Sequence, residues 1–356
     1  MTTLMEDRLR SIGFNAQIAQ GYVELRSHHD HDDHKLRVIE VHRDRVVLHD
    51  GGDQVDARVL PSLMRALDAD HEPLVVGDWV LAQLDRDRMW WVTSRVAPFT
   101  RLARRDSEGR RQCLVSNVDS ALLVMGLDGN HNLRRLERYL AMVQSAGIWA
   151  IIVLTKRDLA THAEQRIDDV RARVPASVPV HAVDARSPET NEELAPYLGP
   201  GQTVVLLGSS GVGKSTLTNA LLGRDVQAIG DVRADDSRGR HTTTARSLHL
   251  LPGGACLIDT PGLRGLQIDA DEATLQASFS DITALAAGCR FRDCTHQHEP
   301  GCAVRSELHP DRLANYRKLV REARRETMTF LDRRKQLAEW KARGRAADQR
   351  MKLKRG

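Results

Sequence analysis

The spacing of hydrophobic residues differs between two parts of this chain of 356 residues. Between residues 35 and 98, short apolar runs alternate with polar residues and are separated by turn residues such as Asp50-Gly51-Gly52-Asp53, a pattern typical of β-strands. We expect strands at 36–41, 45–49, 56–60, 79–84 and 89–96. Five short strands predict a small OB-like β-barrel, although an SH3-like barrel fits the same spacing.

From residue 113 onward, longer apolar runs alternate with helical patterns. The runs at 118–125, 148–154, 178–183, 203–207 and 255–258 predict buried parallel strands, and residues 133–146 and 159–173 predict helices between them. Alternation of this kind predicts a doubly wound α/β domain. The sequence therefore predicts a multi-domain protein whose central domain, residues 113–265, is built around a parallel sheet.

The two ends of the chain have weaker patterns. Residues 1–34 predict an N-terminal extension with one short helix, in which the polar stretch 27–34 is a solvated linker rather than a metal site. Residues 100–112 predict a charged connector. Beyond residue 266 we expect no further strands, but a helical domain at 266–340 that contains a cysteine cluster, followed by a basic tail at 341–356.

Composition and charge narrow the class of protein. Hydrophobic residues make up 41% and charged residues 28%, which favours a packed soluble chain. No run approaches the roughly 18 apolar residues of a membrane helix, and the N-terminus lacks the apolar core of a signal peptide, so we expect a cytoplasmic protein with no membrane partner.

The net charge of +4 is unevenly distributed. Residues 312–356 contain 16 Lys and Arg and 5 Asp and Glu, a charge of +11, so the rest of the chain carries −7. Such a segment indicates contact with nucleic-acid phosphates, or else a solvated helical surface. Trp79, Trp90 and Trp91 in the predicted barrel could stack on bases or pack in the core.

A complete phosphate-binding motif lies between a predicted strand and a predicted helix. The motif matches G-x-x-x-x-G-K-[ST], and with the next residue it reads Gly208, Ser209, Ser210, Gly211, Val212, Gly213, Lys214, Ser215 and Thr216. Its glycines let successive backbone N–H groups point at phosphate oxygens, and the helix N-terminus adds a favourable partial charge. We expect Lys214 to act in catalysis by reaching the β- and γ-phosphates, and Ser215 to ligate Mg²⁺.

Two further segments fit a nucleotide switch. Asp259 ends an apolar strand, where it would help to hold Mg²⁺, and it is followed by Thr260-Pro261-Gly262, in which the N–H of Gly262 would approach the γ-phosphate. This D-T-P-G string indicates a GTPase. The polar stretch Arg238-Gly239-Arg240-His241-Thr242-Thr243-Thr244 fits a switch that contacts Mg²⁺ and the γ-phosphate. We assign Thr243 this role, with the neighbouring threonines as alternatives.

A candidate guanine motif precedes the phosphate motif. Thr155-Lys156-Arg157-Asp158 resembles N-K-x-D, with Thr in place of Asn. The Asp158 carboxylate would accept hydrogen bonds from guanine N1–H and the exocyclic amine, and the aliphatic stem of Lys156 would cover the base. Val183-Asp184-Ala185 loosely resembles a second base-reading element. Because base motifs ordinarily follow the phosphate motif, this order predicts a circular permutation.

A metal site is predicted in the helical domain. Cys289, Cys294, His296 and Cys302 offer three thiolates and one imidazole, the ligand set of a closed structural zinc site. His298 competes with His296 as the fourth ligand. A closed set leaves no position for substrate, so we expect a structural and not a catalytic metal.

Together, the barrel, the permuted motifs, G-R-H-T-T-T and C-x4-C-x-H-x5-C resemble the bacterial ribosome small subunit-dependent GTPase A family over residues 35–340. The resemblance implies binding of GTP/GDP, Mg²⁺ and one Zn²⁺. It also implies contact of the 30S subunit and its 16S rRNA with the barrel and zinc domains, and slow GTP hydrolysis that the subunit stimulates during late maturation. We expect a monomer.

The resemblance also bears on catalysis. Leu263 stands where other GTPases often carry a water-orienting Gln, and the family pattern makes His241 the candidate catalytic replacement. Two rival interpretations stay open: an RNA-binding scaffold in which GTP is mainly structural, and a permuted GTPase that acts on another particle such as the large subunit.

Overall fold

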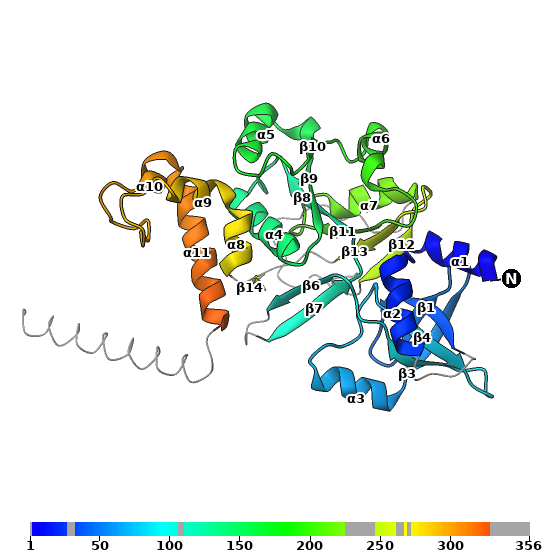
Figure 1. Ribbon diagram of the computed structural model, residues 1–356. Helices are drawn as coiled ribbons and strands as arrows, with labels where there is room; N and C mark the ends of the chain where they lie inside the picture. The colour runs from blue at the N-terminus through cyan, green and yellow to red at the C-terminus, as the bar shows by residue number, and fades with distance from the viewer. Residues whose placement is uncertain are drawn as a thin grey trace, which may run out of the picture. The chain divides into compact units, whose positions relative to one another are not determined.

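The computed structural model describes residues 2–26, 33–105, 110–224, 246–260, 267–268 and 272–327. Its contacts divide the chain into two compact units, residues 1–269 and 270–356. The first unit contains the barrel and the α/β domain, and the second contains the cysteine cluster (Figure 1).

A closed five-stranded barrel occupies the start of the first unit. Its strands are β1 (His34–Val41), β2 (Val46–His49), β3 (Gln54–Val59), β4 (Trp79–Leu84) and β5 (Trp90–Arg95). They pair in the order β1-β2-β3-β5-β4, and β4 pairs again with β1. Only β3 and β5 are parallel among these pairs, and α3 (Pro61–Ala69) connects β3 to β4. This closure confirms the OB-like prediction.

The α/β domain confirms the predicted parallel sheet. Its strands are β8 (Ser120–Gly126), β9 (Trp149–Thr155), β10 (Val180–Ala182), β11 (Thr203–Leu207), β12 (Ser247–Leu250) and β13 (Cys256–Asp259). They are ordered β10-β9-β8-β11-β13-β12, all parallel except β12. The helical segments are α4 (Leu133–Ser145), η1 (Arg157–Leu159), α5 (Ala163–Arg171), α6 (Glu189–Leu194), η2 (Ala195–Tyr197) and α7 (Lys214–Leu222).

The order of these strands locates a ligand site. The chain runs outward from β8 through β9 to β10 and then returns to place β11 on the other side of β8. In open α/β sheets, ligands bind beyond the carboxyl ends of the strands at such a reversal. β12 also pairs with β1 of the barrel, so barrel and α/β domain share one sheet of 11 strands.

Residues 2–26 of the predicted N-terminal extension contain two helices rather than one short helix, and these helices pack on the core. The helices are α1 (Thr2–Ser11) and α2 (Ala16–Arg26), and Leu9, Ile12 and Tyr22 are buried in the core of the first unit. The buried Arg37 guanidinium on β1 donates to the Ile12 carbonyl and, at 2.9 Å, to the hydroxyl of Thr203 on β11. These helices are stabilised by distant partners, which is why the local pattern is weak.

The predicted charged connector also has regular structure. β6 (Arg101–Arg105) and β7 (Arg111–Ser116) pair antiparallel. β14 (Gln267–Ile268) adds a third strand along β6, so the prediction of no strand beyond residue 266 is wrong at these two residues. Leu102 and Leu114 face the core and are fully buried. The arginines between these two leucines dominate the local composition, so the sequence pattern did not predict the strands.

The second unit is helical as predicted. It contains α8 (Glu272–Ser278), α9 (Ser280–Ala286), α10 (Ala303–Glu307) and α11 (Pro310–Thr327). Phe279 is buried and packs against Tyr316, with ring centroids 5.2 Å apart. Arg312 on α11 donates to both oxygens of Asp281 on α9, at 2.7 and 2.8 Å, which ties the two helices together. The predicted basic tail at 341–356 lies outside the described residues.

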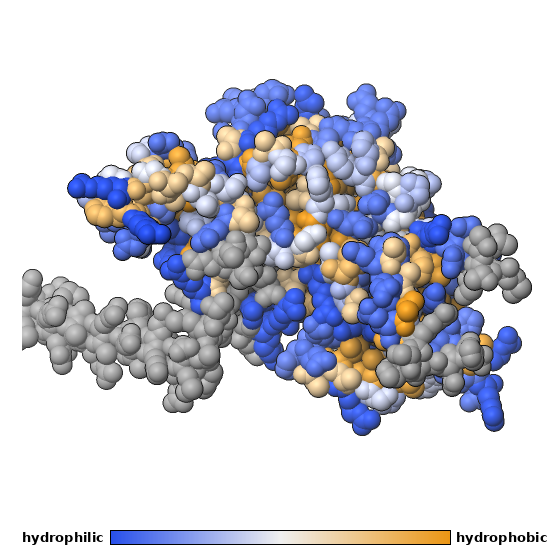
Figure 2. Space-filling model, in the orientation of Figure 1, coloured by the Kyte–Doolittle hydropathy of each residue, from blue (hydrophilic) through white to orange (hydrophobic). Residues whose placement is uncertain are grey.

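Hydrophilic side chains cover most of the face that Figure 2 shows. Within the described part of the chain, no helix combines the length and apolar character needed to cross a membrane.

Candidate functional site

The phosphate motif forms a tight turn between β11 and α7. Gly211 and Gly213 have φ angles of 77° and 95°, which side chains disfavour. A Cβ on Gly208 would lie 2.5 Å from the Val124 carbonyl oxygen on β8. Glycine is thus required at these positions, and the first turn of α7 carries Ser215 and Thr216 just beyond the loop.

Lys214 is folded into this loop. Its side chain is buried, and Nζ donates to the carbonyls of Gly208 at 3.0 Å and Ser209 at 2.9 Å. Burial lowers the pKa of Lys214, and the nearby Asp259 carboxylate opposes that shift. The loop therefore holds a positive charge at its centre, as a phosphate site requires.

Asp259 lies beside Lys214 at the end of β13. It is opposite Leu206 of β11, and the hydroxyl of the next residue, Thr260, donates to the Leu206 carbonyl at 2.6 Å. Burial raises the pKa of Asp259 to about 6, and its buried Oδ1 accepts no hydrogen bond within the described chain. A buried carboxylate oxygen without a partner is suited to a hard cation such as Mg²⁺.

The candidate guanine motif is tied directly to the phosphate loop. Thr155 at the end of β9 is fully buried, and its hydroxyl donates to the Val212 carbonyl at 2.5 Å. Lys156, in a left-handed conformation with φ 61°, donates from Nζ to the Gly211 carbonyl at 2.7 Å. The Asp158 side chain is exposed, and among the described residues nothing engages its carboxylate.

Two residues of this site were not predicted from the sequence. Asp128, just after β8, accepts from Lys156 Nζ at 2.7 Å, and this pairing lowers the pKa of Asp128 against the effect of burial. Arg135 in the first turn of α4 donates to the hydroxyl of Ser209. Neither residue belongs to a motif, because only the fold brings β8 and α4 to the loop.

Of the other predicted nucleotide-site residues, some lie in the described chain and some lie outside it. The second base-reading candidate, Val183-Asp184-Ala185, follows β10 at the same edge of the sheet, where the Asp184 carboxylate accepts from the backbone N–H of Arg186 at 2.9 Å. His241, Thr243 and Gly262 lie outside the described residues.

The four predicted zinc ligands lie together in the second unit. The ligand atoms of Cys289, Cys294, His296 and Cys302 are all within 4.8 Å of one another. His298 is not in this group; its backbone N–H donates to Glu299, which also accepts from Thr295 and Gln297 and so closes the loop. Three sulfurs and one imidazole at this spacing fit one zinc ion.

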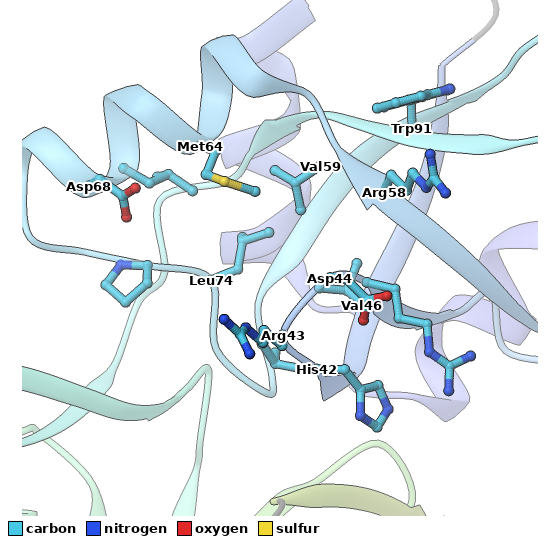
Figure 3. A pocket seen from close by; sticks show the side chains of 14 residues that line it. His42, Arg43, Asp44, Val46, Arg58, Val59, Met64, Asp68, Leu74 and Trp91 are labelled. Atoms are coloured by element: carbon cyan, nitrogen blue, oxygen red, sulfur yellow. The ribbon is translucent and has the colours of Figure 1, made fainter.

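A separate cavity of about 220 Å³ lies in the barrel (Figure 3). Met64, Val59 and Leu74 contribute apolar side chains, while Arg58 and Trp91 line one edge. The indole N–H of Trp91 donates to Asp85 at 2.8 Å, whereas Trp79 is fully buried and therefore serves the core. The cavity contains none of the phosphate-loop residues.

Sequence comparison identifies relatives. The RsgA GTPase family model matches residues 96–269. The small ribosomal subunit biogenesis GTPase RsgA of Xylella fastidiosa (strain M23) is 47% identical over 289 residues, which are 80% of this chain and 86% of the relative. The protein of the same name from Xanthomonas axonopodis pv. citri (strain 306) is 44% identical over 295 residues, 80% of each chain.

Solved structures share the fold. YjeQ from Thermotoga maritima aligns with a TM-score of 0.60 at 22% identity, over 82% of this chain and 98% of its own. YloQ, described as a circularly permuted GTPase, aligns with a TM-score of 0.57 at 23% identity, over 85% of this chain and 99% of its own. The fold of this chain is thus shared with both solved structures.

Proposed function

This chain belongs to the RsgA GTPase family and is a GTP hydrolase, and on that premise we propose that it acts in late maturation of the small ribosomal subunit. It binds the 30S subunit and its 16S rRNA, and the subunit stimulates hydrolysis of GTP to GDP and phosphate. The observation that carries the proposal is the 47% identity to an RsgA relative over four fifths of the chain.

The phosphate loop supplies the electrostatic part of the reaction. Backbone N–H groups of residues 208–216 and the Lys214 ammonium hold the phosphates and offset negative charge that develops during transfer. Ser215, Asp259 and Thr243 would hold Mg²⁺, which would neutralise phosphate charge, and we assign the N–H of Gly262 to the γ-phosphate. The partnerless Oδ1 of Asp259 supports this assignment.

The guanine motif selects the base. Asp158 is exposed and available to two donors of guanine, a pair that adenine does not present. Thr155 and Lys156 act differently from what the motif alone suggests, because their polar atoms bond to the phosphate-loop carbonyls of Val212 and Gly211. Their role is to fix the distance between the base site and the phosphate site.

Three further assignments complete the proposal. Cys289, Cys294, His296 and Cys302 hold one zinc ion that stabilises the second unit. His241 orients the attacking water in place of a Gln. The protein works as a cytoplasmic monomer.

The test is hydrolysis of GTP and ATP by the purified protein, with and without isolated 30S subunits. Lys214→Ala removes the ammonium in the loop, and Arg171→Ala, at the exposed end of α5, is the matched control. Stimulation that is confined to GTP and lost only in Lys214→Ala supports the proposal. GTP binding without stimulated turnover would favour the scaffold interpretation, and stimulation by 50S subunits instead would identify another particle.

A further inference from the structure

The short helix α6 follows the second base-reading candidate, Val183-Asp184-Ala185, and belongs to none of the predicted motifs. Figure 1 shows α6 beside α7, the helix that starts from the phosphate loop. The side-chain amide of Asn191 on α6 donates to the Ala220 carbonyl on α7 at 3.2 Å. α6 therefore connects the base-reading candidate with the helix that follows the phosphate loop.

The base-reading candidate is hydrogen-bonded to the guanine motif. The backbone N–H of Val183 donates to the Leu154 carbonyl on β9 at 2.8 Å, and the backbone N–H of Arg157 donates to the Val183 carbonyl at 3.4 Å. Asp158 is the next residue after Arg157. These bonds place the base-reading candidate beside the backbone that carries the Asp158 carboxylate.

Two donors hold the Asp184 carbonyl, and one of them comes from α6. The Thr190 hydroxyl donates to this carbonyl at 2.6 Å, and the backbone N–H of Ser187 donates to it at 2.8 Å. Thr190 is only 2% exposed, so water has little access to replace its hydroxyl. Because a peptide unit is planar, a donor that fixes the Asp184 carbonyl also fixes the direction of the Ala185 N–H in the same unit.

Other contacts hold α6 itself in place. His181 on β10 lies 2.9 Å from the Glu193 carboxylate through Nδ1 and 2.9 Å from the Tyr197 hydroxyl through Nε2. β10 leads directly into the base-reading candidate. The strand that carries this segment therefore also anchors the helix that carries Thr190.

The Ala185 N–H remains available to a ligand. Within the described part of the chain it donates to no protein acceptor. In a trans peptide the N–H points opposite to the C=O, so this N–H points away from the Thr190 hydroxyl. Ala185 is 6% exposed and shares a buried cluster with Val212 of the phosphate loop. Backbone N–H groups of buried residues are ordinarily paired, so an acceptor on the ligand would complete this one.

We propose that Thr190 is a positioning residue for guanine recognition: its hydroxyl holds the Asp184–Ala185 peptide so that the Ala185 N–H donates to O6 of the base. The inference rests on the proposed function and deepens it, because Asp158 cannot supply this contact. Guanine N1–H and the amine are donors and suit a carboxylate, whereas O6 is an acceptor and needs a donor. Adenine carries an amine in place of O6, so the same N–H would find no acceptor there.

The test combines variants of Thr190 with nucleotides that differ at the base. Thr190→Val removes the hydroxyl and keeps the shape of the side chain, and Thr190→Ser is the matched control that keeps the hydroxyl. The nucleotides are GDP, inosine diphosphate, which keeps O6 but lacks the amine, and 2-aminopurine riboside diphosphate, which lacks O6. Affinities come from displacement of a fluorescent GDP analogue, and melting temperatures without nucleotide show whether each variant is folded.

Thr190→Val should bind GDP and inosine diphosphate about fivefold more weakly, the effect of one hydrogen bond, and should bind the 2-aminopurine nucleotide as the wild type does. Thr190→Ser should match the wild type with all three nucleotides. An equal loss for all three in Thr190→Val would show that Thr190 only stabilises the fold. No loss for any of them would show that the peptide keeps its direction without the hydroxyl. Either result overturns the inference.

Failure of the proposed function would look different. A wild-type protein that binds ADP as tightly as GDP does not select guanine, and that result would refute the proposed function before any variant is made. A wild-type protein that prefers GDP to ADP but binds the 2-aminopurine nucleotide as tightly as inosine diphosphate would refute only the contact between Ala185 and O6.

Discussion

Replacing Thr155 with valine should weaken nucleotide binding without changing the shape of the side chain. The Thr155 side chain is fully buried, and its hydroxyl is 2.5 Å from the Val212 carbonyl of the phosphate loop. A methyl group in place of the hydroxyl leaves that carbonyl without its donor. The base motif and the phosphate loop then lose one of the two hydrogen bonds that join them, the other being from Lys156 to Gly211.

The size of the effect follows from the cost of an unsatisfied buried polar group. That cost is about 1–3 kcal/mol. In the nucleotide-free protein the loop can shift and expose the carbonyl to water, but bound phosphates hold the loop in place. Most of the cost should therefore appear as lost affinity, which corresponds to roughly a 5- to 150-fold increase in the dissociation constant.

The assay is titration of the protein with a fluorescent GDP analogue. Thr155→Ser keeps the hydroxyl and is the matched control, so it should bind within a few-fold of the wild type. Melting temperatures with and without excess GDP show how the cost divides between folding and binding. Wild-type affinity in Thr155→Val, together with an unchanged melting temperature in GDP, would show that the hydrogen bond does not position the loop.

Three other perturbations address the remaining parts of the site. Burial holds the pKa of Asp259 at about 6, above its unfolded value, so the unliganded protein should gain stability as pH falls through 6. Mg²⁺ needs the ionised carboxylate, so its apparent affinity in a GTPase titration should fall about tenfold per pH unit below 6, and a wild-type slope in Asp259→Asn would contradict this. Cys302→Ser should release zinc and lower the melting temperature of residues 270–356, measured by metal analysis and calorimetry, whereas Cys113→Ser should retain the metal. His241→Ala should abolish 30S-stimulated turnover and leave GTP binding intact; stimulated turnover that survives the change would exclude His241 as the water-orienting residue.

The secondary structure was predictable where burial imposes a local pattern. Residues 203–207 are all buried on β11, and a continuous apolar run predicts a strand that is buried on both faces. The five barrel strands were predicted from short apolar runs that alternate with polar residues and are separated by turn residues. By contrast, α1 has only Leu4, Met5 and Leu9 as apolar residues among its ten, and the burial of α1 and α2 depends on partners such as the barrel and Arg37. No local pattern could reveal those partners.

The candidate site divides in the same way. The phosphate loop was evident because its glycines and Lys214 lie within one short segment whose backbone geometry is local. The role of Thr155 was not evident, because its partner Val212 is 57 positions away in the chain. Asp128 and Arg135 were not predicted, because a single carboxylate or guanidinium forms no motif in the sequence. Only the order of the strands shows that these two side chains lie next to the phosphate loop and Lys156.

By itself, the sequence determined the phosphate loop and the cluster of three cysteines and one histidine, and it predicted a base-selecting carboxylate and a switch, because the residues of each lie close together in the chain. The tertiary structure alone decided how they act on one another. It joined the base motif to the phosphate loop and placed His296, not His298, in the metal cluster. Contacts between distant segments depend on strand order and packing, which are properties of the whole folded unit rather than of any one segment.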